Sequence, residues 1–160
     1  MKRSSLLLAA LALALATPLA QADPVKIAHK IPFAQPDQVR DAIKKECDLE
    51  NLMGQALSEF GGGKVQFTDD VKNAKGRVFD AKISGVWAAG GPWGAASILV
   101  EGELRDNGKV VGTVADRRNT TRGAGACSKL TVSGRKIAED IAGWLAAPAM
   151  DTRLGDAGKK

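Results

Sequence analysis

The segment Ser97–Val114, with the sequence SILVEGELRDNGKVVGTV, predicts a β-hairpin and decides the fold class of the chain. Apolar and charged residues alternate through its first half, as they do in a strand with one buried face. Asp106-Asn107-Gly108 then supplies a strong turn signal. We expect a three-residue connection, because that register places the large apolar residues of both strands on one face, whereas a two-residue loop does not. The expected pairs are Leu104 with Val110, Gly102 with Gly112, and Val100 with Val114.

The remaining elements are predicted from hydrophobic periodicity on either side of the hairpin. Apolar residues recur at helical spacing from Pro36 to Phe60 and again over 128–147, where Pro148 ends the second helix. Because Asp48 can cap a restart, a break in the first helix near 47–48 is expected. Trp87 and Trp144 are predicted to lie in the core. Short or alternating apolar runs predict further strands at 25–33, 64–68 and 78–87.

A single α+β domain is the simplest fold for this order of elements, with one mostly antiparallel sheet and two helices packed on one of its faces. The domain is predicted to span residues 23–147, which is an ordinary length for one domain. Residues 148–160 are expected to form a flexible C-terminal tail. Cys47 and Cys127 are predicted to form a disulfide; a metal or redox site is the alternative, but neither cysteine has a ligand at metal-binding spacing.

The first 22 residues have the pattern of a secretory signal peptide. Lys2 and Arg3 precede an unbroken run of leucine and alanine over Leu6–Ala16, which is too short to span a bilayer. Small residues at Ala20 and Ala22 predict cleavage between Ala22 and Asp23. The mature protein is therefore expected to be periplasmic or secreted, without a stable membrane anchor. Its modest positive charge does not indicate a nucleic-acid partner.

The catalytic chemistry available to this sequence is narrow, and we expect no enzyme activity, cofactor or metal site. His29 is the single histidine, so any nucleophilic triad would depend on it. The close acidic pairs are Asp69-Asp70 and Glu101/Glu103, of which the second pair shares one strand face about 7 Å apart. A hydrolase that uses either pair of carboxylates is a minor hypothesis, beside the two that are stated below. An exposed strand face balanced by Arg105 and Lys109 is the preferred interpretation of the glutamates.

Two features are candidates for a contact surface. The loop over residues 88–95 is rich in glycine and longer than a hairpin needs; its candidate binding residues are Gly90, Gly91, Pro92 and Trp93. Exposed aromatic side chains on loops are frequent interface anchors. The alternative is that Trp93 folds back over the sheet. Arg117, Arg118 and Arg122 form a small basic cluster, which suits either an anionic partner or a solvated strand end.

The layout resembles uncharacterised exported proteins of bacterial envelopes whose domains are similar to the N-terminal domain of TolB and to the curli-secretion lipoprotein. The resemblance rests on GKVV at 108–111 and on the closing helix IAEDIAGWL at 137–145, and it covers about residues 25–146. It implies an exported α/β domain and no catalytic residue. Lipid-anchored relatives carry a cysteine at the mature start, where this chain has Asp23.

These observations predict an exported periplasmic protein of the bacterial cell envelope with a non-enzymatic binding or assembly role. Its partner is expected to be an envelope protein, which the 88–95 loop and the arginines would contact. The alternative is a secreted or periplasmic inhibitor that uses the Trp93 loop against an envelope-directed enzyme such as a lysozyme or protease. The sequence does not predict the oligomeric state.

Overall fold

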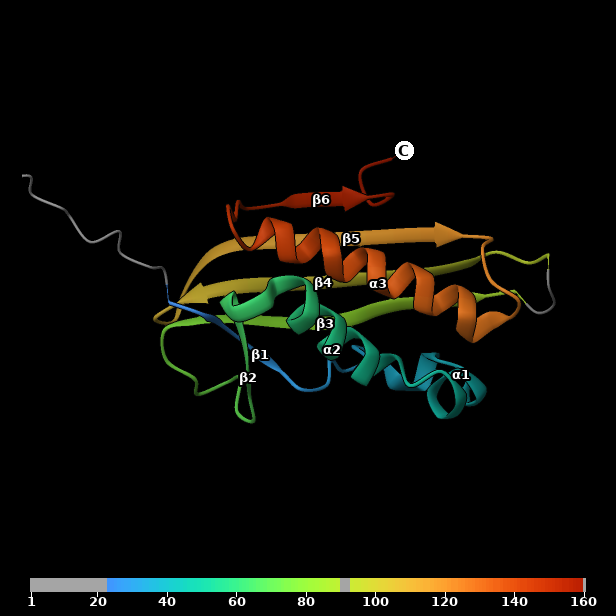
Figure 1. Cartoon of the computed structure of the whole chain (residues 1–160), viewed down its shortest axis with the longest axis horizontal. Coiled ribbons are helices and arrows are strands. Elements are labelled where there is room, and N and C mark those ends of the chain that lie inside the picture. Colours follow the sequence, from blue (N-terminus) through green and yellow to red (C-terminus); the bar gives the residue numbers. More distant parts are fainter. Residues whose placement is uncertain (1–22, 90–92, 160) are drawn as a thin grey trace, which may run out of the picture.

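The computed structural model describes residues 23–89 and 93–159. Within them lies one six-stranded sheet with the order β2-β1-β3-β4-β5-β6, together with three α-helices (Figure 1). The strands are β1 (Val25–Ala28), β2 (Val65–Thr68), β3 (Arg77–Ala88), β4 (Ala96–Asp106), β5 (Lys109–Thr120) and β6 (Thr152–Gly155). The helices are α1 (Asp41–Glu46), α2 (Leu49–Gly61) and α3 (Ala126–Trp144), with short 3₁₀ turns at Pro36–Gln38 and Gly62–Lys64.

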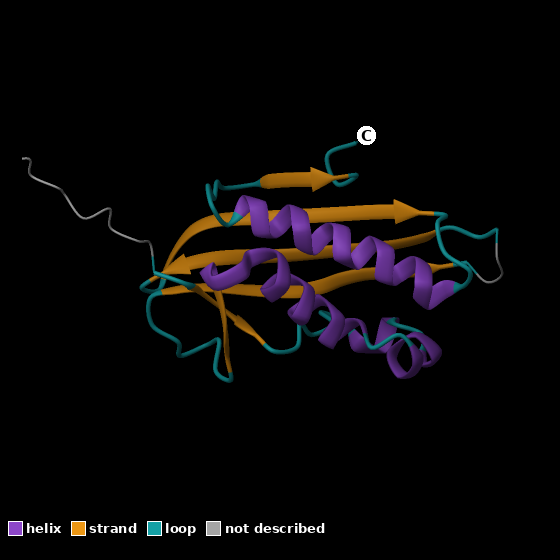
Figure 2. Cartoon of the chain, viewed as in Figure 1, coloured by secondary structure: helices purple, strands orange, loops and turns teal. Residues whose placement is uncertain are grey.

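The helices lie on one face of the sheet and leave the other face open (Figure 2). Antiparallel pairing joins the three long strands β3, β4 and β5. The short strands add to this centre in parallel, with β1 on β3, β2 on β1, and β6 on β5. The predicted single α+β domain is therefore confirmed, as a mixed sheet rather than a purely antiparallel one.

The first predicted helix is divided at the expected place. Asp48 adopts a left-handed backbone conformation with φ of 43°, which separates α1 from α2. Its side chain does not cap a backbone amide of α2, and it accepts a hydrogen bond from Asn51 Nδ2 at 2.6 Å instead. The predicted disulfide is confirmed: the Cys47–Cys127 bond joins the α1–α2 junction to the first turn of α3.

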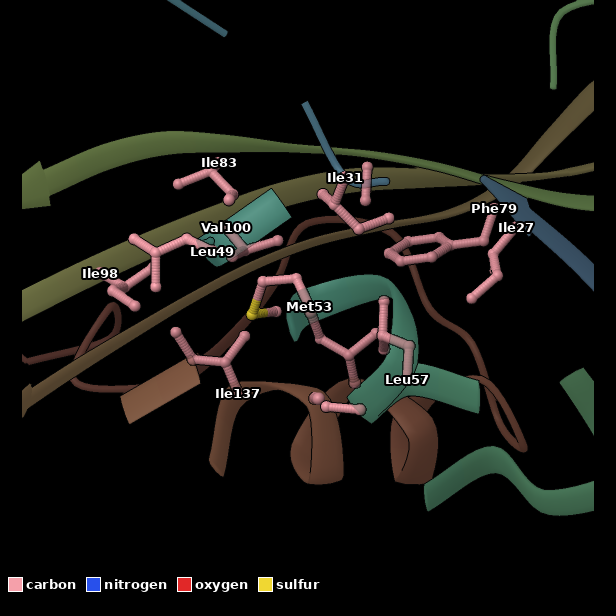
Figure 3. Close-up of a cluster of buried hydrophobic side chains, with 14 of the residues drawn as sticks. Ile27, Ile31, Leu49, Met53, Leu57, Phe79, Ile83, Ile98, Val100 and Ile137 are labelled. Carbon is pink, nitrogen blue, oxygen red and sulfur yellow. The ribbon is translucent and has the colours of Figure 1, made fainter. Parts of the chain in front are cut away.

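The core fills the space between the sheet and the two longer helices (Figure 3). Met53 of α2 is fully buried at its centre, between the strands and the side chain of Ile137 on α3. Trp144, predicted to be core, is buried beside Phe79, with 5.8 Å between ring centroids. Other fully buried members are Ile27, Ile31, Leu49, Leu57, Ile83, Ile98, Val100 and Leu104.

Gly54 sets the distance between α2 and the end of β1. A Cβ atom added there would lie 2.1 Å from the carbonyl oxygen of His29, a backbone atom that cannot turn aside. We expect Gly54→Ala to lower the free energy of unfolding by about 2–3 kcal/mol, since overpacking strain exceeds the gain in helix propensity. Urea unfolding measures the effect. Gly143→Ala is the matched control, because Gly143 is helical and faces open space; a neutral G54A would contradict this packing.

The register of the β4–β5 hairpin differs from the prediction. Asn107 and Gly108 both have positive φ, 49° and 84°, and form a two-residue turn in which Asp106 pairs with Lys109. A register shift next to Leu104 leaves Val111 as an extra residue and restores the apolar side chains to the inner face. The observed pairs are Leu104 with Gly112, Gly102 with Val114, and Val100 with Asp116.

Trp87 is not part of the core, contrary to the expectation from strand alternation. The β3–β4 register shifts between Ile83 and Gly85, so Ser84 is an extra residue in β3. A one-residue bulge moves every later side chain to the opposite face. Val86 and Ala88 consequently face inward, and Trp87 is 57% exposed.

The expected flexible tail at residues 148–160 is also corrected. It contains β6, whose residues Thr152–Gly155 pair with Val114–Arg117 of β5. Thr152 Oγ1 also accepts a hydrogen bond from Trp144 Nε1 at 3.1 Å. These contacts place the segment beside β5 at the edge of the sheet.

The predicted signal peptide, residues 1–22, lies outside the described residues. Over the part that is described, none of the helices has the length and apolar character needed to cross a membrane.

Candidate functional site

The loop between β3 and β4 displays Trp93 from a fixed base. Gly90, Gly91 and Pro92 lie outside the described residues, but Trp93 itself is described and is 92% exposed. The two sides of the loop are joined by a hydrogen bond from Ala89 N to Ala95 O at 2.9 Å. Interpreting Trp93 as folded back over the sheet is therefore wrong.

Two cations from other elements hold the base of this loop. Arg40, which immediately precedes α1, donates a hydrogen bond from Nη2 to the carbonyl oxygen of Ala88. Lys129 of α3 donates from Nζ to the carbonyl oxygen of Gly94 at 2.6 Å, and its side chain is fully buried. Because one side of the loop is held from α1 and the other from α3, the position of Trp93 is coupled to the helix layer.

Trp87 and Arg117 lie on the open face of the sheet near the same loop. Trp87 pairs with Ser97, and Arg117 pairs with Leu99 two residues further along β4. Arg117 is exposed and lies between Asp116 and Arg118, both of which face the helices, so alternation places it on the open face.

The three arginines of the predicted basic cluster do not form one surface. Arg118 faces α3, where its guanidinium bonds to the carboxylate of Asp140 through Nε at 3.0 Å and through Nη2. Arg122 is exposed just beyond β5, where its backbone N donates to Thr120 Oγ1 at 3.0 Å. Without Arg118, the candidate contact surface consists of Trp87, Trp93, Arg117 and Arg122. We name these four residues the tryptophan end.

Glu101 and Glu103 line a shallow groove of about 550 Å³ on the open face of the sheet. Arg105 lies between two acidic groups, with Nε 3.4 Å from Glu103 and Nη2 3.4 Å from Asp80. The predicted balance of Glu103 by Arg105 is confirmed. Further charged groups of the groove are Lys82, Asp151 and Arg153.

The other acidic pair belongs to an exposed turn after β2. Asp70 accepts hydrogen bonds from Asn73 N at 3.1 Å and Asn73 Nδ2 at 2.7 Å, which lower the pKa of its carboxyl. Asp69 lies 3.5 Å from His29 Nε2, and both side chains are exposed. His29 also stacks on Phe67, with 4.4 Å between the ring centroids. These contacts are typical of a turn and give the pair no enclosed site.

The structure also contains a buried carboxyl that the sequence analysis missed. Asp116 of β5 is 0% exposed and pairs with Val100 on one side and Leu154 on the other. Within the described residues, neither of its carboxyl oxygens has a hydrogen-bond partner. The nearest cation is Arg118, whose Nε lies 3.7 Å from Asp116 Oδ1.

Burial raises the pKa of Asp116 to about 7, and the negative charge of the adjacent Asp140 carboxylate contributes in the same direction. The positive charge of Arg118 opposes the shift. Strand alternation continued past Val114, where the predicted hairpin segment ends, places Asp116 on the inner face.

Comparison with known proteins gives no assignment from sequence. No protein-family model matches the chain. No curated protein matches it. The resemblance to TolB and curli-secretion families therefore remains a prediction.

The chain does have similar solved structures. A DUF330 protein from Xanthomonas campestris superimposes with a TM-score of 0.54 at 12% identity, covering 81% of this chain and 87% of that protein. A PelC dodecamer from Paraburkholderia phytofirmans gives a TM-score of 0.47 at 23% identity, covering 76% of this chain and 89% of that one. The first likeness shows a shared fold and nothing beyond it.

Proposed function

We propose that this protein is an exported, non-enzymatic binding or assembly protein of the bacterial cell envelope, and that it contacts an envelope protein through the tryptophan end. The observation that carries the proposal is the 92% exposure of Trp93 on a loop whose base is held by Arg40 and Lys129. A large aromatic side chain presented on a fixed base loses little conformational entropy on binding, which favours its use as an anchor.

The surroundings of Trp93 support an interface. Trp87 adds a second exposed tryptophan at the same end of the β3–β4 hairpin, and Arg117 and Arg122 add cationic groups. Tryptophan and arginine are the residue types most enriched among energetically dominant interface positions. The N-terminal signal pattern and the disulfide support export into an oxidising compartment.

The experiment is capture from envelope extract with the tagged mature protein beside its Trp93→Ala variant. We expect the captured partner to lose at least about thirtyfold in affinity for W93A, since an anchor residue of this kind contributes about 2 kcal/mol or more. Trp87→Ala should lower the affinity for the same partner by a smaller factor. Titration of the purified partner measures both values.

Met150→Ala is the matched control. Met150 is 55% exposed, and it lies just before β6, whose first residue pairs with Val114 rather than with the loop end of β5. Its loss removes an exposed apolar side chain far from the tryptophan end, so binding should be unchanged. A partner that is retained equally by wild type and W93A would overturn the proposed surface.

The projecting Trp93 also favours a second candidate, an inhibitor that inserts this side chain into an envelope-directed enzyme. Assays of a lysozyme and of a secreted protease with the mature protein test this function directly. Inhibition that W93A retains in full would exclude the insertion mechanism.

A further inference from the structure

We propose that β6 is a pH-responsive strap, which closes over the protonated carboxyl of Asp116 at mildly acidic pH and separates from β5 as the pH rises. This device does not depend on the identity of the binding partner. The observation behind the proposal is that the buried carboxyl of Asp116 lies against the short strand β6.

The end of β6 seals Asp116 from water on its outer side. Leu154 is the β6 partner of Asp116, and the next residue, Gly155, has φ of 58°. A Cβ atom on Gly155 would lie 2.5 Å from Asp116 Oδ1 and 2.5 Å from the carbonyl oxygen of Arg117. Only glycine fits this position, because both the left-handed φ and the close approach exclude a side chain.

Few apolar contacts hold the strap in place. Apart from Leu154, which packs partly against the core, its attachments are hydrogen bonds. Asp156 N donates to the carbonyl oxygen of Arg117 at 2.7 Å, and Asp156 Oδ2 accepts from Asn119 N at 3.1 Å. Thr113 Oγ1 accepts from Asp151 N at 2.7 Å. A four-residue edge strand of this kind is expected to open at lower free energy than the whole domain.

The charged groups around Asp116 do not provide it with a dedicated partner. Arg118 on β5 interacts with both Asp116 and Asp140 of α3. Asp140 also forms an ion pair with Lys136, with 3.2 Å between Oδ1 and Nζ. Asp156, in the segment after β6, is another charged group near Asp116, and it forms an ion pair with Lys159 at 2.7 Å. From β4, the residue that pairs with Asp116 is the apolar Val100.

Ionisation of Asp116 is therefore unfavourable, because it places a carboxylate in a buried site beside a guanidinium, that of Arg118, which is already bonded to Asp140. Separation of β6 gives the carboxylate access to water and returns its pKa toward the ordinary range. The closed strap binds the proton more tightly than the open one, so the closed form loses population as the pH rises through the range below about 7.

Amide hydrogen exchange of the mature protein between pH 5 and pH 8 tests the strap. Asp156 N reports on β6, and Ile83 N, bonded to Pro32 O at 2.9 Å, reports on the sheet centre. After correction for intrinsic rates, we expect the protection factor of Asp156 to fall at least tenfold over this range. It should stay below the protection factor of Ile83 at every pH.

Three variants sharpen the test. Asp116→Asn should keep β6 protected across the range without the pH-dependent fall. Gly155→Ala should reduce the protection factor of Asp156 throughout pH 5 to pH 8, because it disrupts the packing of β6 against Asp116 without removing the carboxyl. Gly158→Ala is its control, since a Cβ atom there has only ordinary contacts.

Three results would each overturn the proposal. The first is Asp156 protection that does not vary with pH, and the second is a variation that D116N shares. The third is protection equal to that of Ile83 throughout, because β6 would then separate only when the whole domain unfolds. If D116N does not fold, the wild-type pH series and the pair G155A and G158A still decide the matter.

Discussion

Replacing Cys47 and Cys127 together with alanine should lower the free energy of unfolding by about 4 kcal/mol. The bridge joins residues separated by 80 positions, and the chain entropy that it removes from the unfolded state corresponds to about that free energy. Since domains of this size have total stabilities of about 5–15 kcal/mol, the loss leaves a marginal fold. The bridge also ties the α1–α2 junction to α3, and α1 itself buries only Ile43.

Urea unfolding of the wild type, with and without a thiol reductant, checks this prediction beside the double variant. Reduction of the wild type should reproduce the stability loss of the variant, because both remove the same constraint. Stability that is equal in all three samples would mean that the helices hold α1 without the bridge. A loss seen only in the variant would assign the effect to lost packing of the buried Cys47 side chain.

The main elements of the fold could be predicted because they carry local signals. Asn107-Gly108 predicts a turn from its own chemistry, and the stripe that includes Ile137 and Ile141 predicts α3. The hairpin register could not be predicted, because it depends on a bulge and on tertiary packing. Gly112 lies opposite Leu104, where a Cβ atom would come within 2.7 Å of Trp144.

The parallel strand β6 shows a second limit of sequence reasoning. Its four residues have too little alternation to predict a strand, and parallel pairing with β5 carries no turn signal, because the chain returns through α3. The burial of Asp116 was missed because it requires β5 to continue past Val114, where the predicted hairpin segment ends. Trp93 was easier to select as a candidate contact residue, since a tryptophan in a glycine-rich loop stands out in the sequence alone, but the sequence left open whether it projects or folds back.

Release of the β6 strap would have a consequence for assembly, because it would expose a longer edge of the sheet. With β6 in place, β5 has both neighbours, and the edge of the sheet is a four-residue strand. Release of β6 would leave the longer β5, Lys109–Thr120, with an unpaired edge. Unpaired edges of long strands accept additional strands readily, so release would create a second binding surface on the molecule.

Asp116→Asn should make the protein more stable than the wild type at pH 8, by about 2–4 kcal/mol, and by a smaller margin of about 1–2 kcal/mol at pH 5. Burial raises the pKa of Asp116 in the folded state to about 7, so the folded protein binds more protons than the unfolded chain between about pH 4 and pH 7. Wild-type stability must therefore fall as the pH rises through that window and level off above it. A pKa difference of about three units sets an upper bound of about 4 kcal/mol.

Urea unfolding at pH 5, 6, 7 and 8 measures this linkage for the wild type and D116N. Asp70→Asn is the matched control: hydrogen bonds from Asn73 lower the pKa of Asp70, so its titration lies below this window. We expect D70N to follow the wild-type pH profile and D116N to lose most of it. A D116N profile parallel to the wild type would show that another group carries the pH dependence. A wild-type stability that rises from pH 5 to pH 8 would show that Asp116 is ionised in the folded protein, and the strap would then have no proton to release.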